Sequence, residues 1–101
     1  MAGPENMEIT RAGDGWAVTG ELDARTAPAL ARAVSADPAS STVVHLDLSG
    51  VTFIDSSGLG VLVDLARQAA ADGGSLRLDH PSTAVTRLLE ITKLTETFGV
   101  G

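Results

Sequence analysis

The sequence predicts a small α/β domain: a mixed β-sheet with helices mainly on one face, in the order ββαβαβα. Four segments alternate apolar and polar residues, which is the pattern of strands with one buried face. Segments with a helical period separate the later strands, so parallel pairing with right-handed crossovers is the economical topology. Because a chain of 101 residues suits one domain, we expect a single domain over residues 1–101.

The first two predicted strands form a hairpin. Met7–Thr10 and Trp16–Leu22 both alternate, and the residues between them, Ala12–Gly15, are typical of turns. The period then changes to that of a helix, whose apolar positions are Ala27, Leu30, Ala31 and Val34.

The ends of this first helix are also marked in the sequence. We expect Asp23 or Thr26 to cap its start, and Pro28 is tolerated because it falls in the first turn. The segment Ala36–Ser40 contains a proline and is predicted to end the helix.

The third and fourth predicted strands are Thr42–Leu48 and Ser75–Asp79. In the third strand, alternation puts Val43, His45 and Asp47 on the more polar face. We expect that face to lie away from the helices, which makes the fold a two-layer one. The apolar residues expected to face the helices are Trp16, Val18, Val44, Leu46, Leu76 and Leu78.

The second predicted helix is more apolar than one buried face requires. Its core stripe is predicted to be Leu59, Leu62, Val63, Ala66 and Ala70, and Gly73–Gly74 ends it. Val61 and Leu65 fall outside this stripe, so we expect Leu59, Val61 and Leu65 to contribute to partner docking. A third helix is predicted with Ser82 as its N-cap and an apolar stripe of Val85, Leu88, Leu89 and Ile91; Phe98–Gly101 is predicted to begin a last strand.

Composition and charge exclude several classes of function. The net charge of −6 argues against a nucleic-acid partner. The absence of cysteine excludes disulfides and thiolate chemistry. We find no secretory signal and no segment long enough to span a bilayer, so we expect a cytoplasmic protein without direct membrane insertion. His45 and His80 have no metal-ligand spacing, so neither a metal nor a cofactor is expected.

The most informative stretch is Val51–Gly60, in which a strand turns through two serines into a helix. A serine there is a helix cap, part of an anion site, or a hydroxyl presented for chemistry. A cap needs only one serine, and Gly58 and Gly60 each cost about 1 kcal/mol in a first turn. The glycines therefore suggest that something approaches the backbone closely.

Two kinds of chemistry fit this stretch poorly. The pattern around Ser56 is not the Gly-x-Ser-x-Gly turn of a hydrolase, and neither histidine has the spacing of a positioned base. We therefore expect no enzyme activity. A phosphate cradle is disfavoured because no glycine-rich loop ends in lysine. What remains is a hydroxyl offered to the active site of another protein.

Gly20-Glu-Leu-Asp23 followed by a helix, together with the run from Asp47 to Gly60, resembles the STAS domain of bacterial anti-sigma factor antagonists. The resemblance implies partner switching: the unphosphorylated antagonist binds an anti-sigma factor that is also a serine kinase, a GHKL-type ATPase, and frees the sigma factor. The kinase then phosphorylates the first serine, which matches Ser56, and the complex dissociates. A serine phosphatase resets the switch.

The resemblance also implies the site residues. Asp23 and Asp55 match the acidic residues beside the serine, and Gly58–Gly60 matches the docking turn. Ser56 is expected just outside the first helical turn, whereas Ser57, the second choice for phosphorylation, is expected to use its hydroxyl as the cap. The expected partner-binding residues are Asp23, Asp55, Ser56, Ser57, Gly58, Leu59, Gly60 and Val61.

Two other functions stay open. The chain resembles, less closely, the STAS accessory subunit of a membrane lipid ABC-transport complex. It is also compatible with an interaction domain whose serine is only a cap. Members of the antagonist family usually continue into a complete last strand and a C-terminal helix, and this sequence ends at Gly101.

Overall fold

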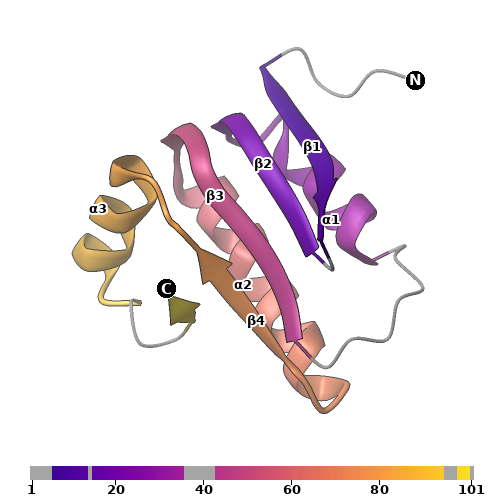
Figure 1. The fold of residues 1–101 in the computed structure, drawn as a ribbon. Helices are drawn as coiled ribbons and strands as arrows, with labels where there is room; N and C mark the ends of the chain where they lie inside the picture. Colours follow the sequence, from indigo (N-terminus) through magenta and orange to yellow (C-terminus); the bar gives the residue numbers. More distant parts are fainter. Residues whose placement is uncertain (1–5, 14, 36–42, 95–97, 101) are drawn as a thin grey trace.

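The computed structural model describes residues 6–13, 15–35, 43–94 and 98–100. These ranges contain one five-stranded sheet and three helices (Figure 1). In chain order the elements are β1 (Met7–Ala12), β2 (Gly15–Leu22), α1 (Ala27–Ser35), β3 (Val43–Ile54), α2 (Ser56–Ala71), β4 (Ser75–Asp79), α3 (Thr83–Thr92) and β5 (Gly99–Val100). The predicted order ββαβαβα is confirmed, and β5 follows it. The predicted end of the first helix, Ala36–Ser40, lies outside the described residues.

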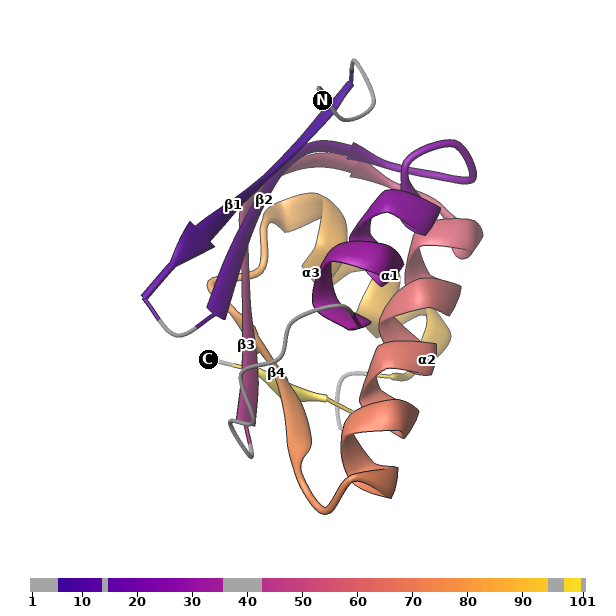
Figure 2. The same ribbon diagram turned by 90° about the vertical axis from the view of Figure 1, so that its right-hand side faces the viewer.

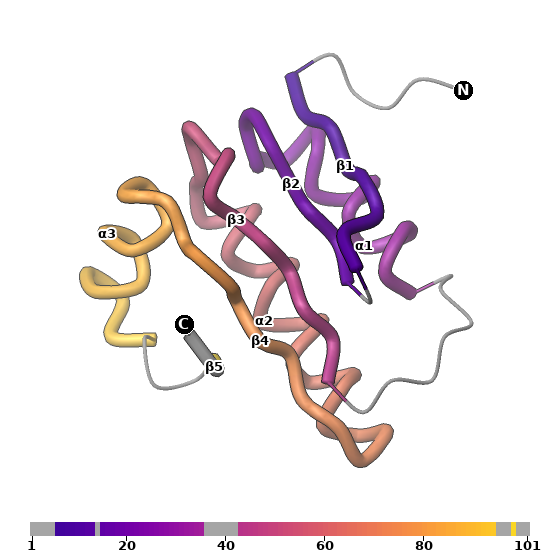
Figure 3. Tube along the Cα trace, viewed as in Figure 1, coloured from indigo at the N-terminus to yellow at the C-terminus, as the bar shows by residue number. Residues whose placement is uncertain are grey.

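The sheet is mixed, as predicted, with strand order β1-β2-β3-β4-β5 (Figure 3). β1 and β2 pair antiparallel as a hairpin, with Ile9 opposite Val18, and all other neighbours pair parallel. Each parallel step is made through one helix. The carboxyl ends of β2, β3 and β4 therefore lie at the same end of the sheet.

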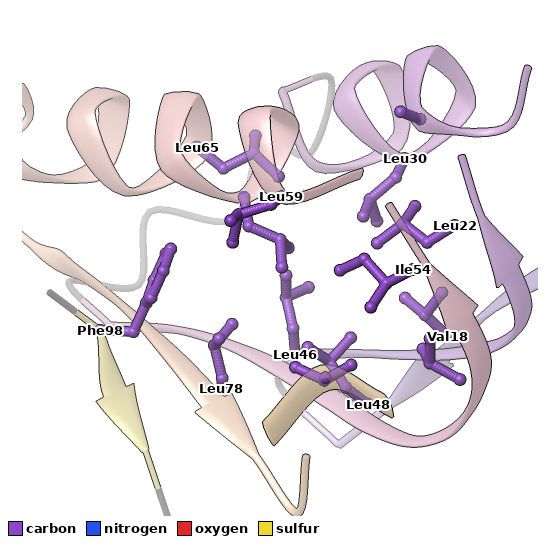
Figure 4. Packing of buried hydrophobic residues seen from close by; sticks show 14 of the residues in the cluster. Val18, Leu22, Leu30, Leu46, Leu48, Ile54, Leu59, Leu65, Leu78 and Phe98 are labelled. Carbon is purple, nitrogen blue, oxygen red and sulfur yellow. The ribbon is translucent and has the colours of Figure 1, made fainter. Parts of the chain in front are cut away.

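The helices lie on one face of the sheet, which confirms the two-layer prediction (Figure 2). The core between the layers contains Val18, Leu46, Leu76 and Leu78 as predicted, and Trp16 and Val44 pack against it while partly exposed. Figure 4 shows several of these buried side chains. The other predicted face of β3, with Val43, His45 and Asp47, is partly exposed.

Strand β3 is longer than the sequence predicts. It continues beyond Leu48 to Ile54, and its pairing with β2 contains two register shifts. The Ser49–Gly50 pair favours a turn in the sequence, but the irregular pairing accommodates it within the strand. The extension carries the chain directly to the two serines.

Three predicted side-chain positions are wrong. Leu65 does not point away from the core but is 4% exposed, because α2 contacts α1 as well as β3 and β4. Two apolar residues expected in the core are on the surface: Ala70, near the end of α2, and Ile91, which is 71% exposed in the last turn of α3. A periodic pattern marks a face of a helix but not where its neighbours end.

The predicted cap of α3 is confirmed. The Ser82 hydroxyl accepts a hydrogen bond from the backbone N–H of Val85 at 3.3 Å. No helix in the described ranges is both long enough and apolar enough to cross a bilayer.

Leu89 and Ile91 give a matched test of the α3 packing. Leu89 is 1% exposed, so Leu89→Ala is expected to lower the free energy of unfolding by about 2–5 kcal/mol. Ile91→Ala is expected to change it by no more than about 0.5 kcal/mol. Urea unfolding of both variants measures the two values. Equal losses would show that α3 packs through a different face.

Candidate functional site

The candidate site lies where β2 and β3 end side by side. Leu22 pairs with Ile54 across the two strands, and the backbone N–H of Asp55 donates to the Leu22 carbonyl at 3.3 Å. Asp23 and Asp55 directly follow these paired residues, and the two serines follow Asp55. We call Asp23, Asp55, Ser56 and Ser57 the serine site.

Asp55 is the N-cap of α2. Its backbone is extended (φ −119°, ψ −171°), and its Oδ1 accepts hydrogen bonds from the N–H of Ser57 at 2.9 Å and of Gly58 at 3.1 Å. The prediction that the Ser57 hydroxyl is the cap is therefore wrong. Aspartate is as good an N-cap as serine, and Asp55 occupies the last extended position before the helix.

Both serines are inside the first helical turn. Ser56 is the first residue of α2, so the prediction that it lies just outside the turn is also wrong. Both side chains are exposed, and within the described residues neither hydroxyl forms a hydrogen bond. Because Asp55 serves the orphan N–H groups, both hydroxyls are available to another molecule.

Asp23 organises the turn before α1. Its Oδ1 accepts hydrogen bonds from the N–H of Arg25 at 3.0 Å and of Thr26 at 3.2 Å. Desolvation raises the pKa of Asp23, but these two N–H donors and the Arg25 charge hold it below its usual value. The Arg25 guanidinium is 3.9 Å from Oδ2 and 72% exposed, so this ion pair is weak.

The two glycines of α2 have different surroundings. Gly58 is buried, and a Cβ there would collide with the Leu22 carbonyl oxygen and lie 2.9 Å from the Leu22 Cγ. The close approach inferred from the sequence is thus made at Gly58 by the chain's own strand β2. Gly60 is exposed, and a Cβ there would meet nothing within 4 Å.

Leu59 belongs to the core, not to an exposed apolar surface. It is 6% exposed and lies among the buried side chains under α2 (Figure 4). The expectation that Leu59 and Leu65 are surplus to the core and free to contact a partner is therefore wrong. Val61 is half-buried, and beside it α2 exposes Gly60 and Asp64. These residues extend the accessible surface along the helix from Ser57.

The polar side chains on the uncovered sheet face form a separate cluster. His45 Nδ1 lies 2.8 Å from Asp79 Oδ2, and the Arg77 Nε–H donates to Asp79 Oδ1 at 3.1 Å. His45 is therefore committed to β4 and not to the serines. No cluster of three or more potential metal-ligating side chains occurs in the part of the chain that the structure describes.

Sequence reasoning assigned Thr26 only a capping role. Its hydroxyl instead bonds backward, to the end of β2, and the residue is 1% exposed. The sequence offers no signal for this arrangement, because a threonine before a helix is already explained as a cap.

Comparison with known proteins identifies similar chains. Residues 6–99 match a family model described as "Mlab, STAS domain". The chain is 34% identical over 77 residues to the anti-sigma-B factor antagonist of Bacillus subtilis, covering 76% of this chain and 71% of the relative. It is 36% identical over 80 residues to the anti-sigma-B factor antagonist of Listeria monocytogenes, covering 78% and 70%.

A solved structure is similar over almost the whole chain. The crystal structure of an anti-sigma factor antagonist from Mycobacterium paratuberculosis aligns with a TM-score of 0.76 and 28% identity. The alignment covers 99% of this chain and 89% of that one.

The capping assignment predicts a clear difference between two neighbouring variants. Asp55→Ala is expected to lower the free energy of unfolding by about 1 kcal/mol, because two N–H groups lose their acceptor. Ser57→Ala is expected to leave it within about 0.5 kcal/mol, because its hydroxyl accepts none of them. Thermal unfolding of both variants tests this. A larger loss for Ser57→Ala would return the cap to that serine.

The glycines give a second matched pair with opposite signs. Gly58→Ala is expected to lower the free energy of unfolding by about 1–3 kcal/mol, because its Cβ collides with β2. Gly60→Ala is expected to raise it by about 0.5–1 kcal/mol, because alanine favours an exposed helix interior. Chemical unfolding of the two variants measures both changes. The same sign for both would contradict the different surroundings of the two glycines.

Proposed function

Because the chain belongs to the STAS domain family, we propose that it is an anti-sigma factor antagonist that acts by phosphorylation-controlled partner switching. The unphosphorylated form binds an anti-sigma factor and so frees a sigma factor. The similarity to two curated anti-sigma-B factor antagonists carries this proposal. The serine site supports it, because two exposed hydroxyls stand at a helix start with no partner among the described residues. In this role the chain is a regulator and not an enzyme.

The proposed phosphorylation site is Ser56, with Ser57 as the second choice. The hydroxyls of both are accessible, so exposure alone does not choose between them. The resemblance assigns the first serine of the pair. Ser56 also directly follows Asp55 in the sequence, so a phosphate at Ser56 adds its charge next to an existing carboxylate.

A phosphate at Ser56 would meet an anion site that is already occupied. The helix start can bind a phosphate through free N–H groups, but Asp55 accepts from two of them. The phosphate carries a charge of about −1.5 to −2 and would share the site with Asp55 and Asp23. In a dry interface this repulsion and desolvation cost several kcal/mol. About 2.7 kcal/mol already changes affinity a hundredfold.

The proposed docking surface is the serine site with the exposed start of α2. Gly60 offers bare backbone, Val61 is partly exposed, and Asp64 lies one turn further. Leu59 supports this surface from beneath. A specific interface buries about 1,200–2,000 Å², so the partner also covers surface along α2 beyond the serines.

The proposed partners are a GHKL-type ATPase that is both anti-sigma factor and serine kinase, and a serine phosphatase. The support is the resemblance together with the exposed Ser56 hydroxyl. The acidic chain, with net charge −6, favours association with a basic docking surface.

A second candidate function is the accessory subunit of a lipid ABC-transport complex. The matching family model is described as "Mlab, STAS domain". This description by itself does not decide between the two functions. The two curated antagonists favour the regulatory one. Co-purification with a transporter ATPase, with no phosphate on either serine, would favour the transporter role.

Incubation with the partner kinase and ATP, followed by phosphate mapping by mass spectrometry, tests the proposed switch. The wild type is expected to carry phosphate on Ser56 and to leave the complex. Ser56→Ala is expected to bind the kinase but to stay bound after ATP is added. Ser56→Asp is expected to bind at least tenfold more weakly than the wild type, although one carboxylate carries less charge than phosphate.

Ser57→Ala is the matched control, because it removes a neighbouring exposed hydroxyl. We expect phosphorylation of Ser56 to continue in this variant. Phosphate on Ser57 alone would move the site by one residue. Absence of phosphate from the wild type would exclude the proposed switch.

A further inference from the structure

Thr26 is buried next to the serine site. Within the described residues it is the one polar side chain that is fully buried, at 1% exposed. Its Oγ1 accepts a hydrogen bond from the N–H of Asp23 at 2.8 Å and donates to the carbonyl of Glu21 at 2.7 Å. The hydroxyl therefore joins the end of β2 to the residue that follows it.

The Thr26 hydroxyl is not needed to cap α1. The N–H of Ala27 donates to the Asp23 carbonyl at 2.8 Å, and the N–H of Ala29 donates to the Thr26 carbonyl at 3.0 Å. Pro28, between them, has no N–H. The first N–H groups of α1 are thus satisfied without the side chain, which leaves the hydroxyl to hold the loop.

The loop that Thr26 holds carries Asp23. The bonds within it are reciprocal: Thr26 accepts from the Asp23 N–H, and Asp23 Oδ1 accepts from the Thr26 N–H. The preceding residue, Leu22, is fixed to β3 by the bond from the Asp55 N–H. The backbone of Asp23 is thus held on both sides, next to Asp55.

One oxygen of Asp23 stays available in this arrangement. Oδ1 is used by the loop, whereas the nearest cation to Oδ2 is the exposed Arg25 guanidinium at 3.9 Å. A carboxylate oxygen held in this way suits a cationic or N–H donor on a partner. Its position depends on the loop because the side chain is short.

We infer that Thr26 is a positioning residue for partner recognition: its hydroxyl fixes Asp23 so that Oδ2 faces a cationic or N–H donor of the docked partner. The inference rests on the proposed function, in which Asp23 belongs to the docking surface. Thr26 itself is too buried to touch the partner, so it acts through Asp23.

A double-mutant cycle tests this inference. The affinity of the unphosphorylated chain for its anti-sigma kinase is measured without ATP for wild type, Thr26→Val, Asp23→Asn and the double variant. Thr26→Val is expected to weaken binding about tenfold, the effect of losing about one well-placed hydrogen bond. In the Asp23→Asn background the same change is expected to have no further effect. Thr26→Ser keeps the hydroxyl and is expected to bind within about twofold of wild type.

Stability is controlled separately. Ser82→Ala removes the cap of α3, outside the serine site, and is expected to lower the free energy of unfolding about as much as Thr26→Val does. This variant is expected to bind the kinase like the wild type. If Thr26→Val does not fold, Thr26→Ala removes the same hydroxyl and carries the same expectation. NMR titration of Asp23 adds a readout that needs no partner: loss of the hydroxyl is expected to raise its pKa.

The outcomes separate the inference from the proposed function. If the wild type binds the kinase and Thr26→Val binds it with the same affinity, the inference is overturned and the proposed function is not. Equal losses from Thr26→Val in both backgrounds also overturn it, because Thr26 would then not act through Asp23. Failure of the wild type to bind any anti-sigma kinase overturns the proposed function, and the inference with it.

Discussion

The parallel pairing of β2 with β3 is the constraint on which the serine site depends. Because Leu22 lies opposite Ile54, Asp23 and Asp55, the residues that follow them, lie at the same end of the sheet. The bond from the Asp55 N–H to the Leu22 carbonyl fixes this alignment. The same carbonyl lies against Gly58, so α2 can begin here only with a glycine in its first turn. A shift of the pairing by one residue would separate the two carboxylates.

The two aspartates have different structural roles within one site. Asp55 satisfies the N–H groups at the start of α2, which leaves the serine hydroxyls unengaged. Asp23 satisfies the N–H groups of the turn before α1 through Oδ1, which leaves Oδ2 outside these hydrogen bonds. Both carboxylates are thus held by backbone donors and not by flexible cationic side chains. An added charge at Ser56 therefore meets negative groups that cannot easily move away.

The sequence predicts the fold better than the site because the two depend on different information. Alternation in β2, β3 and β4 is set by burial of one sheet face, so Val18, Leu46 and Leu78 could be placed correctly. The burial of Leu65 depends on how α2 packs against α1 and the sheet, and no local pattern contains such long-range contacts. The choice of cap among Asp55, Ser56 and Ser57 depends on where β3 ends. That end is set by the irregular pairing with β2, which the sequence does not reveal.

The two glycines of α2 separate a position that the fold requires from a position that the fold leaves free. At Gly58 the constraint is internal, because an added Cβ would collide with the Leu22 carbonyl of the chain's own strand β2. A Cβ at position 60 would meet nothing within 4 Å in the described part of the chain, so under the proposed function only a docked partner would constrain that position. In the proposed role, a side chain introduced at position 60 would exclude some partners by steric overlap and leave the fold unchanged. Under that proposal, the choice of partner would be adjusted at a single exposed position.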